Sequence, residues 1–183
     1  MNLLFRLVWM FLTVGRRSRC DVLEESRLSF RVLPTDLDVN LHLTNARYFS
    51  FMDLSRVDHL IRAGAWKKIR ANKFMPVLGS GSVRFRRPVP PFKRIDVTTR
   101  IVGCDERWIY LEHKLIDGNT TYSLAVLKAA FLDTKGRIPT TRFLKEIGYS
   151  GAIPPMTEAL ELIRDADEAL SEIAEASNRP ASA

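Results

Sequence analysis

One long stretch with helical periodicity, followed by several strand-like stretches joined by tight turns, constrains the fold of this chain most. Residues 45–63 place apolar side chains at helical spacing, and Gly64 is a natural stop. Strands are expected over residues 26–33, 77–86, 95–101, 108–116 and 121–132. Asp117-Gly118-Asn119 has residues that suit a hairpin turn. This order predicts an α+β domain, with an antiparallel sheet that carries a helix on one face.

Glycines and basic residues mark two of the segments between these elements. Gly79 and Gly81 fall on one face of the expected strand if alternation is regular, which indicates close approach of another backbone, such as the central helix. Residues 66–74 contain four Lys or Arg and are expected to form a basic connector.

Residues 36–48, DLDVNLHLTNARY, concentrate polar and titratable side chains directly ahead of the expected helix. If residues 38–42 are extended, Asp38, Asn40 and His42 share one side, and the two aliphatic residues between them point into apolar surroundings. This arrangement suits a base with its orienting partners. Thr44 or Asn45 is a suitable N-cap for the helix.

The same residues have other interpretations. Asp36 can close a turn after Pro34, and Asn40 can serve only as a turn residue. A single histidine at a helix entry is commonly a hydrogen-bonding surface residue. A metal site formed by Asp36, Asp38 and His42 is a further alternative, but no second His/Cys cluster in the sequence supports it.

The segment DLDVNLHLTNARYF closely resembles the DLDVNQHVNNVKYI-type motif of plant acyl-carrier-protein thioesterases, which belong to the hotdog-fold superfamily. The longer runs over residues 31–60 and 82–115 resemble the thioesterase-superfamily-member-six type of protein and, more loosely, the 4-hydroxybenzoyl-CoA thioesterase type. The resemblance covers roughly residues 27–135. It implies a hotdog fold, in which an antiparallel sheet wraps a central helix, with N- and C-terminal helical extensions.

The resemblance also implies thioester hydrolysis without a metal or another cofactor. Carried over residue by residue, it marks Asp38, Asn40 and His42 as the catalytic candidates. Asp38 would act as base or as nucleophile, Asn40 would position the carboxylate or water, and His42 would exchange a proton. Backbone N–H groups at the helix start, around Asn45, would hold the oxyanion. Hotdog proteins commonly pair their sheets with the site at the interface, so a homodimer or higher homo-oligomer is implied.

One departure from the plant enzymes keeps other functions open. Where those enzymes carry an acid and a Cys after a YRR segment, this chain reads Phe85-Arg86-Arg87-Pro88-Val89. The alternative is therefore a non-catalytic hotdog protein that binds acyl-CoA and acts at a membrane through a partner. A dehydratase of the same fold is a third option, but its usual histidine-containing helix signature is not evident.

The net charge of +7 is unevenly distributed. From Pro154 onward there are seven acidic residues against two arginines, a balance of −5, so the first 153 residues carry +12. A basic body suits the phosphates of coenzyme A or of a carrier protein's phosphopantetheine. The phosphate candidates are Arg84, Arg86, Arg87, Lys93 and Arg94. No nucleic-acid-binding motif is present, so nucleic acid is the weakest choice of partner.

Residues 2–15 are strongly apolar, with one interruption at Arg6, and Arg16, Arg17 and Arg19 follow. Fourteen helical residues span about 21 Å, which is short of the roughly 30 Å hydrocarbon core of a membrane. We expect a shallow interfacial anchor whose basic flank faces anionic headgroups on the cytoplasmic side. The alternative is a helix that packs on the domain or on a partner subunit.

The predicted organisation has three parts. Residues 1–22 form the apolar and basic N-terminal helix, residues 23–150 the hotdog domain, and residues 151–183 an amphipathic acidic helix with a tail. The last helix is expected over residues 155–176, as a cover for the sheet or a dimer contact, and residues 178–183 are expected to be disordered. Two cysteines, Cys20 and Cys104, lack motif spacing and favour a reducing, cytoplasmic compartment.

Overall fold

The computed structural model describes residues 2–177, so the expected disorder of residues 178–183 lies outside the described part. Six strands form one antiparallel sheet in the order β1-β3-β4-β5-β2, and β6 pairs with β5. The strands are β1 (Ser26–Arg31), β2 (Met75–Phe85), β3 (Arg94–Cys104), β4 (Ile109–Asp117), β5 (Thr120–Asp133) and β6 (Gly136–Arg137). The α-helices are α1 (Asn2–Thr13), α2 (Asn45–Arg62), α3 (Ala65–Ala71), α4 (Thr140–Glu146) and α5 (Glu158–Ser177), and short 3-10 helices cover Val14–Arg16 and Pro34–Asp36.

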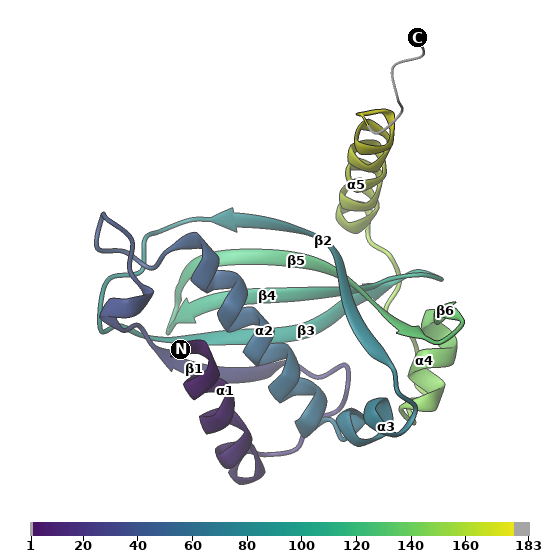
Figure 1. Ribbon diagram of the computed structural model, residues 1–183, viewed down its shortest axis with the longest axis horizontal. Helices are drawn as coiled ribbons and strands as arrows, with labels where there is room; N and C mark the ends of the chain where they lie inside the picture. The colour runs from purple at the N-terminus through teal and green to yellow at the C-terminus, as the bar shows by residue number, and fades with distance from the viewer. Residues whose placement is uncertain (1, 178–183) are drawn as a thin grey trace.

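Helix α2 lies diagonally across the concave face of the curled sheet (Figure 1). Its apolar stripe is buried there, and Phe51 stacks on Phe30 of β1 with ring centroids 4.6 Å apart. Burial of each large apolar side chain contributes about 1.5–3 kcal/mol. Gly64 follows the helix with φ +73°, a left-handed conformation that glycine adopts readily. The predicted sheet wrapped around a helix over residues 45–63 is therefore confirmed.

A second apolar cluster forms where α3 and α4 meet the end of β5. Phe143 of α4 stacks on Phe131 of β5 with centroids 3.7 Å apart, and Ile69 of α3 is buried nearby. α3 occupies most of the basic connector expected at residues 66–74, and the sequence analysis did not predict this helix. Ala65 and Ile69, four residues apart, bury one side of this short helix, and its basic residues hide that spacing in the sequence.

The two glycines of β2 meet side chains on different elements. A Cβ at Gly79 would lie 2.4 Å from the Trp108 ring, and one at Gly81 would lie 2.5 Å from Leu127 Cδ2. The register of β2 against β5 shifts between Leu78 and Ser80, which breaks the regular alternation there. The predicted approach of the helix backbone to a shared glycine face was therefore wrong, because the side chains of Trp108, just before β4, and of Leu127 in β5 fill the space.

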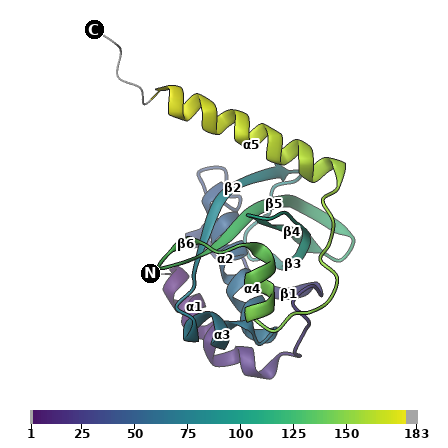
Figure 2. The same ribbon diagram turned by 90° about the vertical axis from the view of Figure 1, so that its right-hand side faces the viewer.

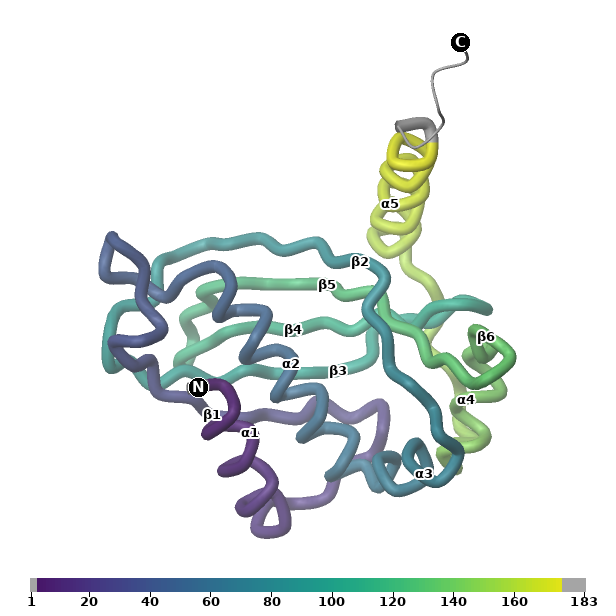
Figure 3. The backbone as a smooth tube through the Cα atoms, viewed as in Figure 1, coloured from purple at the N-terminus to yellow at the C-terminus, as the bar shows by residue number. Residues whose placement is uncertain are grey.

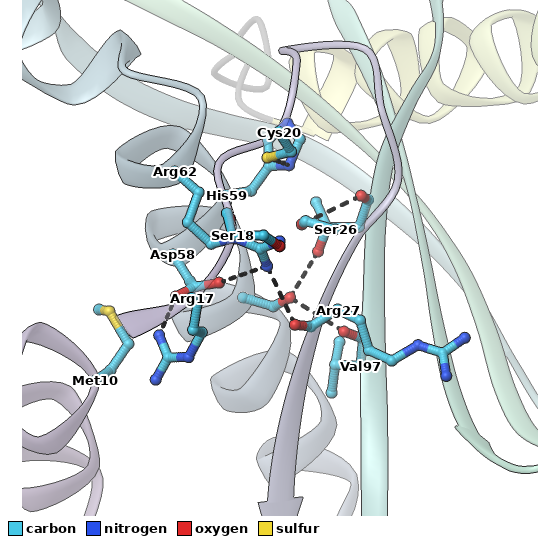
Figure 4. A network of polar contacts seen from close by, with 12 residues as sticks. Met10, Arg17, Ser18, Cys20, Ser26, Arg27, Asp58, His59, Arg62 and Val97 are labelled. Carbon is cyan, nitrogen blue, oxygen red and sulfur yellow. Dashed lines mark hydrogen bonds and ion pairs between the residues drawn. The ribbon is translucent and has the colours of Figure 1, made fainter. Parts of the chain in front are cut away.

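The N-terminal segment packs beside α2 (Figure 1), and a buried ion network fastens it there. Met10 of α1 is buried in the core cluster. Asp58 of α2 is fully buried and pairs with Arg17 and with Arg62, which also donates to the backbone of Ser18 and Arg27. Figure 4 shows Asp58 between these two guanidinium groups. Of the three arginines that follow the apolar stretch, Arg17 therefore forms an ion pair within the fold.

Helix α5 begins against the sheet and then projects away from it (Figure 2). Leu160 is buried and packs against Gly103 of β3. A Cβ at Gly103 would lie only 2.5 Å from Leu160 Cδ1. Lys128 of β5 pairs with Asp167 at 2.5 Å, while Leu170 and Ile173 further along are exposed. The first half of the helix therefore covers part of the sheet, as one of the two predictions for it states.

A line of polar side chains crosses the core between α2 and the sheet. Ser55 Oγ lies 2.8 Å from Thr99 Oγ1, which lies 2.9 Å from His113 Nδ1, and all three residues are fully buried. Burial lowers the pKa of His113 from 6.5 to about 3, and the nearby Arg56 charge lowers it further. The imidazole is therefore neutral in the folded chain.

This buried histidine predicts loss of stability in mild acid. The unfolded histidine takes up a proton near pH 6.5 while the folded one stays neutral down to about pH 3, so stability falls as the pH falls through this window. Between pH 7 and pH 5 the free energy of unfolding, measured with urea, should decrease by about 2 kcal/mol less in His113→Gln than in the parent chain. Equal losses in both proteins would show that His113 is not held neutral.

Candidate functional site

The loop before α2 closes on itself instead of running as a strand. Asp38 N donates to His42 O at 2.8 Å, Leu37 and Leu43 form a β-bridge, and Leu41 takes a left-handed backbone with φ +58°. Val39 and Leu41 are 97% and 66% exposed. The expectation that residues 38–42 are extended with these two side chains in apolar surroundings was wrong, because the tip turns outward.

The Asp38 carboxylate holds this loop together. Its Oδ1 accepts hydrogen bonds from Asn40 N at 2.9 Å and from His42 N at 3.2 Å. Asp38 and Asn40 are exposed, and His42 is half-buried. The three candidates therefore lie in one compact turn, gathered by a carboxylate oxygen and not by the shared face of a strand.

Asp36, two residues earlier, has a structural part. Its carboxylate is fully buried, 2.5 Å from Arg6 Nη2 of α1 and 3.3 Å from Arg47 Nε of α2, and accepts from Leu33 N at 2.9 Å. The last bond closes the turn after Pro34, which confirms that interpretation of the sequence. Among residues 2–177 no group of three or more His, Cys, Asp or Glu side chains is placed to hold a metal ion.

The start of α2 adjoins the Asp38 loop. Thr44 N donates to Asp36 O at 3.0 Å, and the Thr44 side chain makes no capping hydrogen bond. The first N–H groups of a helix have no acceptor within the helix, so those of Asn45 and Ala46 remain available to a ligand. The helix dipole adds a partial positive charge at the same place. An oxygen that develops negative charge would be stabilised here.

Tyr48 is a neighbour of Asp38 that the sequence analysis left without a role. The ring is buried and meets Phe85 of β2 edge-on at 4.9 Å. Burial raises the pKa of Tyr48, and the Asp38 charge and Tyr122 raise it further. The hydroxyl therefore stays protonated beside the loop. The sequence did contain a signal for this role, because Tyr48 follows Asn45 by three residues and so lies on the same side of α2.

The five basic candidates lie at the same end of the sheet as the loop, where β2 ends and β3 begins (Figure 3). Leu43 N donates to Val89 O at 2.9 Å and joins the two segments. Lys93 pairs with Asp117, and Arg94 reaches Ser29 Oγ at 3.4 Å. Arg84, Arg86 and Arg87 are exposed and form no side-chain hydrogen bond or ion pair with another described residue. These three are the better placed to bind an anion.

A cavity of about 340 Å³ lies between the C-terminal half of α2 and the sheet. Its walls are mostly apolar and come from α2, α3, β2, β3, β4, β5 and α4. This volume falls in the range of small-molecule pockets.

Neither cysteine is prepared for nucleophilic chemistry. Burial raises the pKa of the Cys104 thiol to about 12, with Asp105 adding to the effect. Burial also raises the pKa of Cys20, whose Sγ lies 4.0 Å from His59 Nδ1. Since the thiolate is the reactive form, both thiols are poor nucleophiles at neutral pH.

Comparison with known sequences gives a family for most of the chain. The family model of the thioesterase-like superfamily matches residues 32–170. Protein THEM6 of Danio rerio is 36% identical over 107 residues, which cover 58% of this chain and 53% of that protein. Thioesterase lcsJ of Purpureocillium lilacinum is 31% identical over 155 residues, with 72% of this chain and 50% of that protein covered. The chain spans about half the length of these relatives.

Solved structures agree on the fold. The chain is similar to the YbaW probable thioesterase from Escherichia coli with a TM-score of 0.62 and 18% sequence identity. The match covers 66% of this chain and 95% of that one. Together with the curled antiparallel sheet and its helix, this similarity confirms the predicted hotdog fold.

Substitution of Asp36 and substitution of Asp38 should have different effects on the stability of the chain. Asp36→Asn leaves Arg6 and Arg47 without their buried carboxylate, and we expect the free energy of unfolding to fall by about 3 kcal/mol. Asp38→Asn retains an oxygen that can accept both loop hydrogen bonds, so its urea unfolding curve should match that of the parent. The reverse order of stabilities would contradict this assignment.

Proposed function

Because the chain belongs to the thioesterase-like superfamily, we propose that it hydrolyses acyl thioesters of coenzyme A or of an acyl-carrier protein. The observation that carries the proposal is the Asp38 loop directly beside the open N-terminus of α2. A thioesterase needs a group that attacks the carbonyl carbon, directly or through water, and donors for the oxygen that becomes negative. These two requirements meet at this end of the helix.

Asp38 is the proposed base or nucleophile. Both of its backbone hydrogen bonds go to Oδ1, so Oδ2 is the oxygen available to a water molecule or to the thioester carbon. As a base it would take a proton from the attacking water, and as a nucleophile it would form an acyl-enzyme anhydride that water then opens. The bonds to Oδ1 hold the carboxylate in one orientation in either case.

The proposed oxyanion site is the first turn of α2, at the N–H groups of Asn45 and Ala46. One such donor contributes roughly 3–4 kcal/mol in comparable sites. Asn40, exposed on the tip, would position the water or the carboxylate. His42 would donate or accept the proton that moves as the thiol leaves.

Arg84, Arg86 and Arg87 are the proposed contacts for the carrier's phosphates. They extend from the end of β2 near the Asp38 loop, and their exposed guanidinium groups can bind phosphate through two parallel hydrogen bonds. Lys93 and Arg94 are weaker candidates in this arrangement, since Asp117 and Ser29 already contact them.

Thiol release from acyl-CoAs of increasing chain length tests the proposal. We expect release by the parent chain and a fall in kcat/KM of at least ~100-fold in Asp38→Asn, because general base catalysis typically contributes this much. His42→Ala should fall by a smaller factor, since proton exchange with solvent replaces part of its role. A chromogenic thiol trap follows the reaction.

The matched control is Asp165→Asn, which removes an exposed carboxylate on α5. Its rate on short-chain acyl-CoAs should remain within a factor of ~3 of the parent, because long-range surface charges are largely screened. If the parent chain binds acyl-CoA but does not cleave it, the thioesterase proposal is wrong. The alternative function, a non-catalytic acyl-CoA-binding protein, then takes its place.

We also propose that the chain works as a homodimer or a higher homo-oligomer. β2 is an edge strand of the sheet, and each of its residues is exposed or half-exposed. An edge strand of this length presents a row of backbone donors and acceptors to another chain. A second copy paired there would lie beside Arg84 and Phe85, close to the Asp38 loop.

A membrane surface is the proposed location. No helix within residues 2–177 is both long and apolar enough to cross a bilayer. The outward side of α1 nevertheless exposes Leu4, Phe5, Val8, Trp9 and Leu12, and Arg16 and Arg19 follow as exposed cations. An apolar helical face with a basic flank suits the interface of an anionic leaflet. The cytoplasmic face of a membrane fits this charge.

Vesicle sedimentation checks this location. The parent should bind vesicles of phosphatidylcholine with phosphatidylserine, and the double variant Phe5→Gln/Trp9→Gln should bind at least ~10-fold more weakly, because two exposed aromatic side chains lose their burial in lipid. Leu170→Gln on α5, an equally exposed apolar residue, is the control and should bind as the parent does. A change in oligomer size with unchanged vesicle binding would assign the α1 surface to a second copy instead.

A further inference from the structure

Arg56 of α2 has a hydrogen-bonding capacity that the described chain does not satisfy. One of its terminal nitrogens, Nη2, pairs with Asp53 Oδ1 at the surface. The other, Nη1, is buried and has no hydrogen-bond partner among residues 2–177. A buried donor without an acceptor is costly and uncommon in folded proteins, so the position favours a ligand that supplies an acceptor.

Arg56 is one of the residues that line the 340 Å³ cavity, together with Thr99. Thr99 continues into the buried line of Ser55 and His113, so the cavity has one polar side. The rest of its wall includes Asp53 and His59 but is mostly hydrocarbon, from residues Val57, Leu60, Val77, Leu78, Ile101, Ile109, Leu111 and Phe131 among others. A ligand with an apolar body and one polar atom matches this lining.

Side-chain contacts between α2 and β2 extend from the neighbourhood of the Asp38 loop to the cavity. Tyr48 meets Phe85 near the loop, the Phe49 ring lies 3.8 Å from where a Cβ at Gly81 would be, and Asp53 and Arg56 share the cavity with residues 76–78. Arg56 is eleven residues beyond Asn45, or ~16 Å along the helix. A chain whose thioester lies at the start of α2 must therefore be long to reach Arg56.

We propose that this cavity receives the far part of the acyl chain and that Arg56 donates a hydrogen bond to a neutral oxygen on it. The substrate class is then a medium- or long-chain thioester whose hydroxyl or carbonyl group lies well away from the thioester carbon. This inference rests on the proposed thioesterase function and specifies its substrate.

Charge balance favours a neutral oxygen over a carboxylate. Asp53 already pairs with Arg56, so a carboxylate in the cavity would bring an excess negative charge into mostly apolar surroundings. Neither nearby histidine compensates it. Burial lowers the pKa of His59, which lines the cavity, and holds the pKa of His113 at about 3, so both rings stay neutral. A hydroxyl or carbonyl oxygen accepts the hydrogen bond of Nη1 without this cost.

Three CoA esters of equal length test the proposal: dodecanoyl-CoA, ω-hydroxydodecanoyl-CoA and dodecanedioyl-CoA. For the parent, kcat/KM should be at least ~10-fold higher for the ω-hydroxy ester than for either of the others, since a buried donor left unpaired disfavours the plain chain. The same series at hexadecanoyl length covers a deeper placement of the oxygen. The ratio between substrates within one protein is the readout, and it does not depend on how much of the protein is folded.

Two variants and one control assign the preference. In Arg56→Met the ω-hydroxy to plain ratio should fall to about one, while Arg100→Met, which removes an exposed arginine of β3, should leave the ratio unchanged. If Arg56→Met does not fold, Ala129→Leu replaces it, because a larger side chain on the cavity wall should slow dodecanoyl-CoA relative to butanoyl-CoA by at least ~10-fold.

The outcomes separate the two proposals. Hydrolysis with a hydroxy-to-plain ratio near one in the parent overturns the substrate class and leaves the thioesterase intact, and a preference for the dicarboxylic ester overturns the neutral acceptor. If no ester is hydrolysed, calorimetric binding of ω-hydroxydodecanoic and dodecanoic acids decides instead. Tighter binding of the hydroxy acid that is lost in Arg56→Met supports the inference, and equal binding overturns it.

Discussion

The buried carboxylate of Asp36 is the interaction on which the candidate site depends. It receives Arg6 from α1, Arg47 from α2 and the backbone of Leu33, so three segments that are separate in sequence meet at one anion. Each partner removes part of the desolvation cost that a buried charge carries. The Asp38 loop leaves this anchored point and returns to it through Thr44 N, which binds Asp36 O. The position of Asp38 relative to the helix start is set in this way.

Helix α2 links the two halves of the functional account. Its N-terminus offers backbone donors beside Asp38, and its middle carries Arg56 into the cavity ~16 Å further on. Phe51, Met52 and Leu54 fix the helix between these points by packing against the sheet. A rigid element therefore determines the distance between the reacting carbonyl and the far end of the acyl chain, and chain length becomes a matter of geometry.

Periodicity was enough to predict a helix on an antiparallel sheet, and the family resemblance implied that this is a hotdog fold. The strands, the helix over residues 45–63 and the hairpin at Asp117-Gly118-Asn119 follow from local spacing, and the structure confirms them. The motif gave the place of the candidate site, but not its geometry. Asp38 forms two hydrogen bonds with its own loop, and only three-dimensional contacts show that Val39 and Leu41 turn outward. From the sequence alone, Arg56 is indistinguishable from an ordinary surface residue of an amphipathic helix. Its burial depends on β2 and β4, which are distant in sequence.

The most direct test of this account is a crystal structure of the chain with a non-hydrolysable ketone analogue of ω-hydroxydodecanoyl-CoA. The account predicts the ketone oxygen within hydrogen-bond distance of the N–H groups of Asn45 or Ala46, with Asp38 beside the carbonyl carbon and the terminal hydroxyl at Arg56 Nη1. An acyl chain that lies outside the space between α2 and β2, with its carbonyl away from the start of α2, would contradict it.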